Sequence, residues 1–442
     1  MEEFIKTLTE QIRCTKARDG VARELSNHIM DQTEAYEQSG MEHDKAVAKA
    51  VCGMGDPVEI GVSMDRIHRP QIDRRMLLLI FVLSIAGMLC MMPMYGVERV
   101  LFRQGMFLLA GVAVTAIVYF VDYSIIGRAG VVIYIIMTIF FFIGRHYMPV
   151  VNGRIPAMSI LVYLYVPAFA GILYQLRMRG YGAVVIGFVV IGATCLATTY
   201  FSATLWVTVN IGVCMIVMLF AAIRKGMFGQ EKKRMTMLAA AAVILPMVVL
   251  IWRISTNWRW ESFRVMRLKA FFQRKQYEGG AGYIYNVIDD ILRNAKFVGT
   301  GNSKYGEGMD FAMAMDNGFT PLMSIYTYGI IVGILLLILL AALVLRAVKI
   351  VYNQKNQLGF LVSMACMMVI LLNCLEGLLI NVGWFPATST LIPFLVYGGS
   401  GTLVYAVLLG LLLGVHRYEK VYTEETYIGQ PRWRVNLKIE KR

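Results

Sequence analysis

Residues 385–414 read FPATSTLIPFLVYGGSGTLVYAVLLGLLLG, and this stretch decides the class of fold. It ends in an unbroken apolar run that is long enough for most of a membrane-spanning helix of about 20 residues. A polar, glycine-rich pentapeptide precedes the run: Tyr397-Gly398-Gly399-Ser400-Gly401. Because lipid cannot hydrogen-bond irregular backbone, such a segment must lie against protein or a wet cavity. The pentapeptide is therefore a candidate lining of a substrate-binding surface.

The composition of the chain is typical of a membrane protein. Of its 442 residues 57% are hydrophobic and only 16% are charged, and the apolar residues form long runs. In a soluble protein the net charge of +14 would suggest nucleic acid as a partner. Basic cytoplasmic loops and contact with anionic membrane lipid account for it here, so we expect no nucleic acid. The cysteines and histidines show no ligand spacing, so the sequence predicts neither a disulfide framework nor a protein metal site.

Ten apolar stretches have the length of membrane spans. They lie near 76–95, 105–122, 130–144, 156–176, 182–201, 203–223, 235–252, 321–345, 358–380 and 390–415. The third is short and only a minimal turn at Ser202 separates the fifth from the sixth, so eight or nine spans are alternatives. Basic residues gather on one side of these spans, which places both termini in the cytoplasm. The sequence thus predicts an all-α, polytopic membrane protein of about ten transmembrane helices, with both termini in the cytoplasm.

Residues 1–70 have a more polar pattern, with apolar residues at helical spacing. Asp56-Pro57 is a favourable helix start, since Asp caps free amides and Pro suits the first helical position. We expect a small soluble helical bundle in the cytosol. Residues 38–70, QSGMEHDKAVAKAVCGMGDPVEIGVSMDRIHRP, resemble the prefix domain found ahead of some bacterial permeases and membrane regulators. That resemblance implies a regulatory or docking role. At the other end, residues 421–442 are expected to form a basic cytosolic tail.

A long loop at 253–320 is expected on the outer side of the membrane. Its first part, WRWESFRVMRLKAFFQRKQ, places aromatic and aliphatic residues on one helical face with Arg264, Arg267 and Lys269 around it. Such a helix lies in the plane of the lipid headgroups, where it either contacts substrate or serves only as a membrane-bound connector. A polar, Gly-rich stretch with four aspartates follows it.

Two patches of sequence, taken in order, match the motifs of one family. The first patch comprises Arg267-Leu268, Phe271, Gly282-Tyr283, Asn286, Gly299 and Gly301. The second comprises Asn381-Val382-Gly383, Pro386, Pro393-Phe394 and Tyr397-Gly398-Gly399-Ser400. They resemble the motifs "RL..F", "GYQ" and "G.G", and then "NIG…P…PLPFISYGGSS", of the SEDS proteins of the FtsW/RodA/SpoVE type. The resemblance covers residues 75–420 and implies a fold of ten spans with both ends inside.

Members of this family polymerise lipid II, a disaccharide-peptide carried on undecaprenyl pyrophosphate, outside the membrane. The resemblance implies a peptidoglycan glycosyltransferase of cell wall synthesis that works with a class B penicillin-binding protein. Arginines at the headgroup plane would hold the pyrophosphate, with Mg²⁺ or Mn²⁺ as a candidate cofactor. The implied substrate-binding set is Arg264, Arg267, Lys269, Tyr283, Asn286, Glu376, Asn381, Pro393, Tyr397, Gly398, Gly399 and Ser400.

The match is inexact at the catalytic carboxylate, which must take a proton from the attacking sugar hydroxyl. The family's Asp, counted back from YGIIVG at 328–333, falls on Gly318. Asp316, two residues earlier, is the first candidate for the base, and Asp310 is the second; alternatively, both only keep a loop hydrated. The family motifs "PSE..K" and "PD.G" read PAMSILVYLY and CLATTYFSATLW here.

Glu376 lies inside the ninth predicted span, where a charge is costly enough to require a cavity or a partner. We expect it to line the substrate cavity, or else to be a paired structural group. Two other functions stay open at this point. One is a flippase or transporter of a lipid-linked precursor, because polar cavities and broken helices also suit transport. The other is a non-catalytic scaffold whose N-terminal domain recruits partners.

Overall fold

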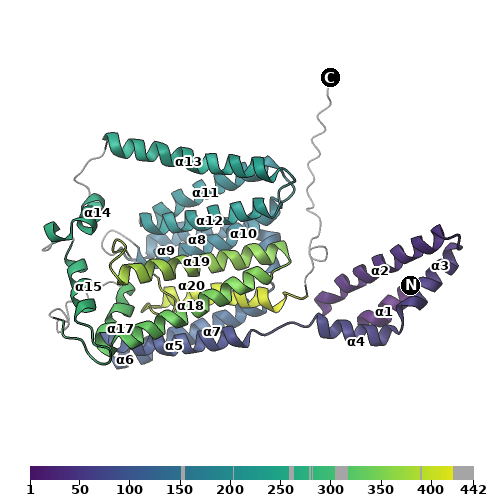
Figure 1. Ribbon diagram of the computed structural model, residues 1–442, viewed down its shortest axis with the longest axis horizontal. Helices are drawn as coiled ribbons and strands as arrows, with labels where there is room; N and C mark the ends of the chain where they lie inside the picture. The colour runs from purple at the N-terminus through teal and green to yellow at the C-terminus, as the bar shows by residue number, and fades with distance from the viewer. Residues whose placement is uncertain are drawn as a thin grey trace, which may run out of the picture. The chain divides into compact units, whose positions relative to one another are not determined.

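The computed structural model describes residues 1–150, 155–202, 204–257, 263–277, 280, 282–303, 317–388 and 391–421. In this part of the chain the regular structure is entirely helical (Figure 1). Contacts divide the chain into two compact units. The first comprises Met1–Asp73, Asn353–Phe360 and the described residues from Val415 onward, and the second comprises Arg74–Tyr352 and Leu361–Gly414.

Four helices build most of the first unit: α1 (Glu2–Glu10), α2 (Thr15–Gln38), α3 (His43–Met54) and α4 (Pro57–Ile67). Helix α1 packs against α4, and α2 packs against α3. The buried faces carry apolar residues at helical spacing, such as Leu8 and Ile29. The predicted helix start at Asp56-Pro57 is confirmed. The Asp56 side chain accepts a hydrogen bond from the amide of Val58, and Pro57 is the first helical residue.

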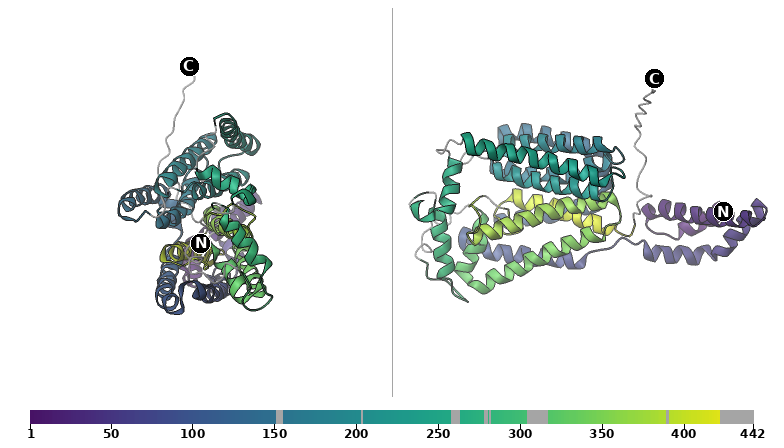
Figure 2. Two further views of the ribbon diagram at one scale, coloured as in Figure 1. Left: turned by 90° about the vertical axis from the view of Figure 1, so that its left-hand side faces the viewer. Right: turned by 45° about the horizontal axis from the view of Figure 1, so that its top comes forward.

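The second unit consists of long apolar helices (Figure 2). Up to residue 175 they are α5 (Arg74–Tyr95), α6 (Val97–Arg99), the π-helix η1 (Val100–Gln104), α7 (Gly105–Phe120), α8 (Ser124–Tyr147), α9 (Pro156–Leu161), η2 (Val162–Leu164) and α10 (Tyr165–Gln175). Then follow α11 (Tyr181–Ser202), α12 (Leu205–Arg224), α13 (Lys232–Asn257), α14 (Phe263–Phe272), η3 (Arg274–Tyr277) and α15 (Tyr283–Arg293). The last are η4 (Asn317–Phe319), α17 (Thr320–Tyr328), α18 (Ile330–Asn353), α19 (Gln357–Asn381) and α20 (Gly399–Arg417).

Nine stretches of the described chain are long and apolar enough to cross a membrane, and each overlaps a predicted span. Helix α13 covers the remaining predicted span, 235–252. The spanning helices differ in burial. In the α9–α10 stretch and in α19, 78% of the residues of the apolar window are buried, against 17% in α8. Helices such as α8 therefore expose apolar side chains of the kind that lipid accepts, whereas α10 and α19 form the protein interior.

Two predicted spans have the wrong extent. The stretch 321–345 is not one helix, because α17 ends at Tyr328 and α18 begins at Ile330. Gly329 between them has a φ of +99°, and a Cβ there would lie 2.6 Å from the carbonyl oxygen of Phe297. The segment after α15, which contains Phe297, thus approaches position 329 too closely for any residue other than glycine. The last span, predicted at 390–415, begins only at Gly399, after irregular backbone.

Candidate functional site

Asn381, the last residue of α19, binds the segment that precedes α17. Its side-chain amide donates to the carbonyl of Gly318 at 2.8 Å, and its oxygen accepts from the amide of Leu322 at 3.0 Å. A further bond of 2.7 Å joins it to the carbonyl of Gly377 in its own helix. Asn381 is 3% exposed, so these bonds satisfy main-chain groups that water does not reach. These bonds fix Gly318 to α19. Gly318 is the position at which the family motif would place its Asp.

Residues 274–277 and 282–291 pack at the same end of α19. The Arg274 guanidinium binds the carboxylate of Asp289 at 3.3 Å and the carbonyl of Gly383. It also lies 5.0 Å from the ring centroid of Tyr285, whose hydroxyl accepts from the amide of Ala387 at 3.0 Å. An apolar core joins these elements; its buried members are Tyr285, Val287, Ile288, Ile291, Phe319, Leu322, Met323 and Ile380. We call this assembly of residues 274–277, 282–291, 318–323 and 380–387 the α19-end cluster.

Glu376 lies about one turn before Asn381 on α19, and it is 7% exposed. One carboxylate oxygen accepts from the side-chain amide of Asn210 in α12 at 2.5 Å. The other accepts from the hydroxyl of Thr388 at 2.8 Å. The Asn210 amide also donates to the Tyr163 hydroxyl at 3.4 Å. A carboxylate and its polar partners therefore lie together inside the helices of the second unit.

The pentapeptide of the second sequence patch packs against protein. The ring of Tyr397 stacks on that of Tyr95 in α5, with centroids 4.2 Å apart. The amide of Gly398 donates to the side chain of Gln104 at 3.0 Å, and Gln104 donates in turn to the hydroxyl of Thr402 at 3.1 Å. Ser400 is half-buried in the first turn of α20. These contacts give the irregular backbone the protein environment that it needs at membrane depth.

Pro393, which is buried, sits where the backbone turns sharply. The next residue, Phe394, has a φ of +65°. Its carbonyl oxygen would lie 2.0 Å from a Cβ at Gly87 in α5, so only glycine allows this approach. The irregular segment before α20 is thus fitted closely against α5.

The remaining predicted site residues have different surroundings. On α14 and α15, Lys269 and Asn286 are half-buried and Tyr283 is exposed. The backbone of Arg264 and Arg267 is in α14, and their side chains lie outside the described part of the structure. Asp310 and Asp316 also lie outside the described residues.

Several polar residues of these clusters were not predicted. Asn210 and Gln104 are polar positions in or beside apolar spans, which was a usable signal. Arg274 and Thr388 gave no such signal, since each adjoins other polar residues in the sequence. Among the described residues no three His, Cys, Asp or Glu side chains come together as a metal site.

Comparison with known proteins gives consistent matches. The sequence model of the FtsW/RodA/SpoVE family, described as "Cell cycle protein", matches residues 71–421. Stage V sporulation protein E of Bacillus subtilis is 30% identical over 92 residues, which are 21% of this chain and 25% of that protein. The probable peptidoglycan glycosyltransferase FtsW of Trichlorobacter lovleyi is 26% identical over 203 residues, 45% of this chain and 49% of that protein. The matches thus span half or less of these relatives.

Solved structures share the fold. One match is a chain from a peptidoglycan synthase complex, which is described as coordinating polymerization and crosslinking. The TM-score is 0.61 and the sequence identity is 15%, and the match covers 79% of this chain and 99% of that chain. The rod shape determining protein RodA of Thermus thermophilus matches with a TM-score of 0.53 and 14% identity over 79% of this chain and 97% of its own. The fold is therefore that of a polytopic, all-α membrane protein of the RodA type. With the family match over 71–421, the chain belongs to the FtsW/RodA/SpoVE family of bacterial membrane proteins.

Proposed function

We propose that this protein is a peptidoglycan glycosyltransferase that polymerises lipid II. The observation that carries the proposal is the anchoring of Gly318 and Leu322 by Asn381. Asp316 directly precedes this anchored segment in the sequence. A general base must be held within hydrogen-bond reach of the proton that it takes, and an anchored segment supports that requirement.

The reaction needs a base and a site for a charged leaving group. Asp316, or else Asp310, would accept the proton of the attacking sugar hydroxyl. In the same step the oxygen of that hydroxyl would form a bond to the anomeric carbon of the second sugar. The bond from that carbon to the lipid pyrophosphate breaks in the same step. Arg264, Arg267 and Lys269 would stabilise the departing pyrophosphate, because charge-assisted hydrogen bonds to phosphate are the strongest that side chains offer. A divalent cation carried by the pyrophosphate itself stays a prediction.

The location and partner belong to the same proposal. With both termini in the cytoplasm, the segment 253–320 faces outward, where lipid II is polymerised. Cysteine labelling from the two sides of the membrane would check this, with 253–320 reacting from outside and 224–234 from inside. A class B penicillin-binding protein is the proposed partner. Support for it comes from the fold shared with a chain of a complex that couples polymerization to crosslinking.

One observation favours a rival function. The carboxylate of Glu376 with Asn210 and Thr388 is a polar group among spanning helices, as lipid-carrier transport would also require. Proteoliposomes that contain the protein and labelled lipid II separate the two functions. A glycosyltransferase lengthens glycan chains without moving intact lipid II across the bilayer. Movement of lipid II without chain growth would instead establish the transporter.

A further inference from the structure

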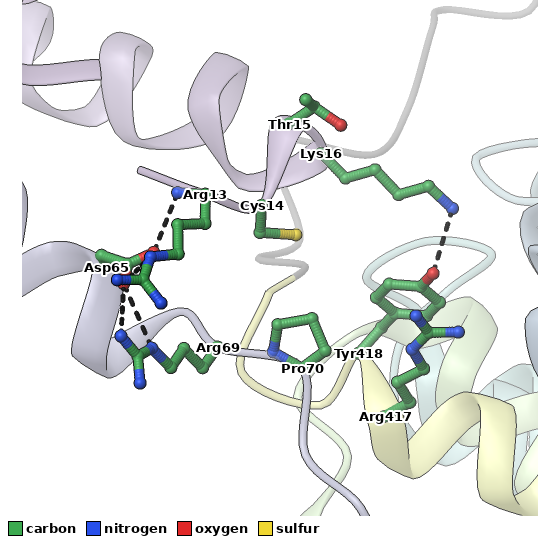
Figure 3. A pocket seen from close by; sticks show the side chains of 9 residues that line it. All are labelled: Arg13, Cys14, Thr15, Lys16, Asp65, Arg69, Pro70, Arg417 and Tyr418. Carbon is green, nitrogen blue, oxygen red and sulfur yellow. Dashed lines mark hydrogen bonds and ion pairs between the residues drawn. The ribbon is translucent and has the colours of Figure 1, made fainter. Parts of the chain in front are cut away.

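Basic residues are balanced differently in the two units. In the first unit two of them bind one carboxylate. Asp65 accepts from the main-chain amide of Arg13 at 2.9 Å and from two nitrogens of Arg69 at 3.1 and 2.9 Å (Figure 3). In the second unit, residues 174–234 contain seven arginines and lysines but only one carboxylate, that of Glu231. Most of the positive charge of this stretch therefore has no counterpart nearby in the sequence.

Two connections between spanning helices pair within this stretch. Residues 176–180 join α10 to α11, and residues 225–231 join α12 to α13. Two backbone hydrogen bonds of 2.9 Å link them, from the amides of Met178 and Gly180 to the carbonyls of residues 227–228. The side chains of residues 227–228 are buried, so they fix the second connection to the helices. We call residues 176–180 and 225–231 the paired connections.

The first of the paired connections holds a methionine in a conformation that favours glycine. Met178 has a φ of +61°, which a residue with a side chain rarely adopts. Its amide and that of Gly180 are bonded to the second connection, so the pairing holds this conformation in place. The Met178 side chain is 82% exposed, between two helices that span the membrane. Strained backbone of this kind is concentrated at binding sites.

An arginine lies on each side of Met178, and neither pairs with a carboxylate in the part of the chain that the structure describes. The Arg177 guanidinium lies 4.3 Å from the centroid of the Tyr174 ring, which orients it. Its Nη1 atom is enclosed and has no hydrogen-bond acceptor. A half-buried guanidinium without an anion loses hydration that nothing in the described chain replaces. Arg179 is exposed.

The second connection brings two more cations to the same place. Arg224 is the last residue of α12, where this connection begins. The Lys232 ammonium lies against Gly226, because a Cβ at Gly226 would be 3.0 Å from its Nζ atom. Both side chains are exposed, and among the described residues neither forms an ion pair. Glu231 is already paired with Arg234, at 3.5 Å.

We propose that the paired connections bind the headgroup of an anionic phospholipid. Connections this short between two spans lie at the level of the headgroups, and their surplus of positive charge favours a headgroup with net negative charge. Arginine donates to phosphate oxygens through a planar fork, and Arg177 is already oriented by Tyr174. Met178 would enter the adjoining acyl-chain region. The bound lipid would hold the two connections together.

Native mass spectrometry of the full-length protein from mixed micelles tests the proposal. It compares the retention of phosphatidylglycerol with that of phosphatidylcholine, and the wild-type protein should retain phosphatidylglycerol in preference. Arg179→Gln and Arg224→Gln should each lower this retention about fivefold, the usual contribution of one basic residue at an anionic membrane surface. Arg177→Gln should lower it about tenfold or more, because this side chain is half-buried and oriented.

Three further variants separate a built site from a merely positive surface. Lys349→Gln is the matched control, because Lys349 is an exposed basic residue near the end of another spanning helix, α18. Arg177→Lys keeps the charge but lacks the planar fork, so it should also lower retention. Met178→Gly suits the left-handed backbone and should lower retention without loss of stability, by removing the apolar contact. Equal thermal midpoints in phosphatidylcholine micelles confirm that the variants are folded.

The outcomes that overturn the proposal are equally specific. The first is equal retention of the two lipids by the wild-type protein. The second is retention of phosphatidylglycerol by the arginine variants at the level of Lys349→Gln. The third is full retention by Arg177→Lys, which would reduce the site to nonspecific attraction of charge.

Discussion

Asn381 and Glu376 lie about one turn apart on α19 and are similarly buried, yet they are held in different ways. All three hydrogen bonds of Asn381 go to main-chain groups, among them those of Gly318 and Leu322. Those of Glu376 go to the side chains of Asn210 and Thr388. Asn381 is therefore a buried polar group satisfied by the main chain, and Glu376 is one satisfied by other side chains.

The difference in partners predicts a difference in role. A side chain bound to main-chain groups fixes the path of the chain, because those groups have no alternative partner when buried. A side chain bound to other side chains can change partners by a change of rotamer. Asn381 is thus expected to position the proposed catalytic segment, whereas Glu376 contributes a polar interior that can rearrange.

The largest expected effect concerns the segment that Asn381 anchors. Asp316→Asn should lower the rate of lipid II polymerisation by about 10²–10⁴, because it removes the proton acceptor, and should leave lipid II binding intact. Asp310→Asn is the control and should be milder. Normal polymerisation by Asp316→Asn with loss in Asp310→Asn would assign the base to Asp310. Full activity in both variants would end the proposal that either aspartate is the base.

The second test removes the anchor itself. Asn381→Leu would leave the buried carbonyl of Gly318 and amide of Leu322 without partners, at about 1–3 kcal/mol each. We expect a clear fall in the thermal unfolding midpoint and a loss of polymerisation. Asn373→Leu is the matched control on the same helix, since the Asn373 amide donates to the carbonyl of Val369 one turn earlier. Equal shifts in the two variants would remove the special role of Asn381.

The third test concerns the pyrophosphate. Arg264→Ala and Arg267→Ala should each weaken lipid II binding by about 1.5–3 kcal/mol, the usual contribution of a hydrogen bond to a charged group. Met266→Ala, at an exposed position of the same helix, controls for lost contact with the membrane. Equilibrium binding of labelled lipid II measures the effect. Unchanged affinity in both arginine variants would leave α14 only as a membrane anchor.

The fourth test addresses Glu376 directly. Glu376→Gln keeps a hydrogen-bonding side chain of the same shape, so Thr388 can still donate to its carbonyl oxygen. The free energy of unfolding should therefore fall by no more than about 1 kcal/mol. The thermal midpoint should accordingly shift less than in Asn381→Leu. A shift as large as that of Asn381→Leu would show that both residues fix the fold in the same way.

The smallest effect is expected at Asp65, which has both a main-chain and a side-chain partner. Its pKa is lower in the folded than in the unfolded protein, chiefly because of the Arg13 amide. Its stabilisation is therefore complete above the unfolded value of about 3.9 and is lost as the pH falls through the lower folded value. Asp65→Asn should make the thermal midpoint of the first unit less dependent on pH in this acidic range. Identical pH profiles for the two proteins would contradict this.

The sequence predicted the helices well because each apolar run is long and continuous. It could not predict that Gly329 divides a run, since the cause is the approach of Phe297, 32 residues away in the chain. The cost of a charge in lipid singled out Glu376, but its partner Asn210 is 166 residues away. The family motif likewise singled out Asn381, whereas its bond to Gly318 spans 63 residues. Local pattern thus singled out individual residues, and only the fold shows which of them are in contact.

The most direct measurement of the central claim is glycan-strand formation by the purified protein from lipid II, with and without a class B penicillin-binding protein. The account predicts strands whose length grows with time, and a rate that Asp316→Asn and Asn381→Leu both reduce while Asn373→Leu does not. Binding of lipid II by the unmutated protein without any strand formation, even with the partner present, would contradict it.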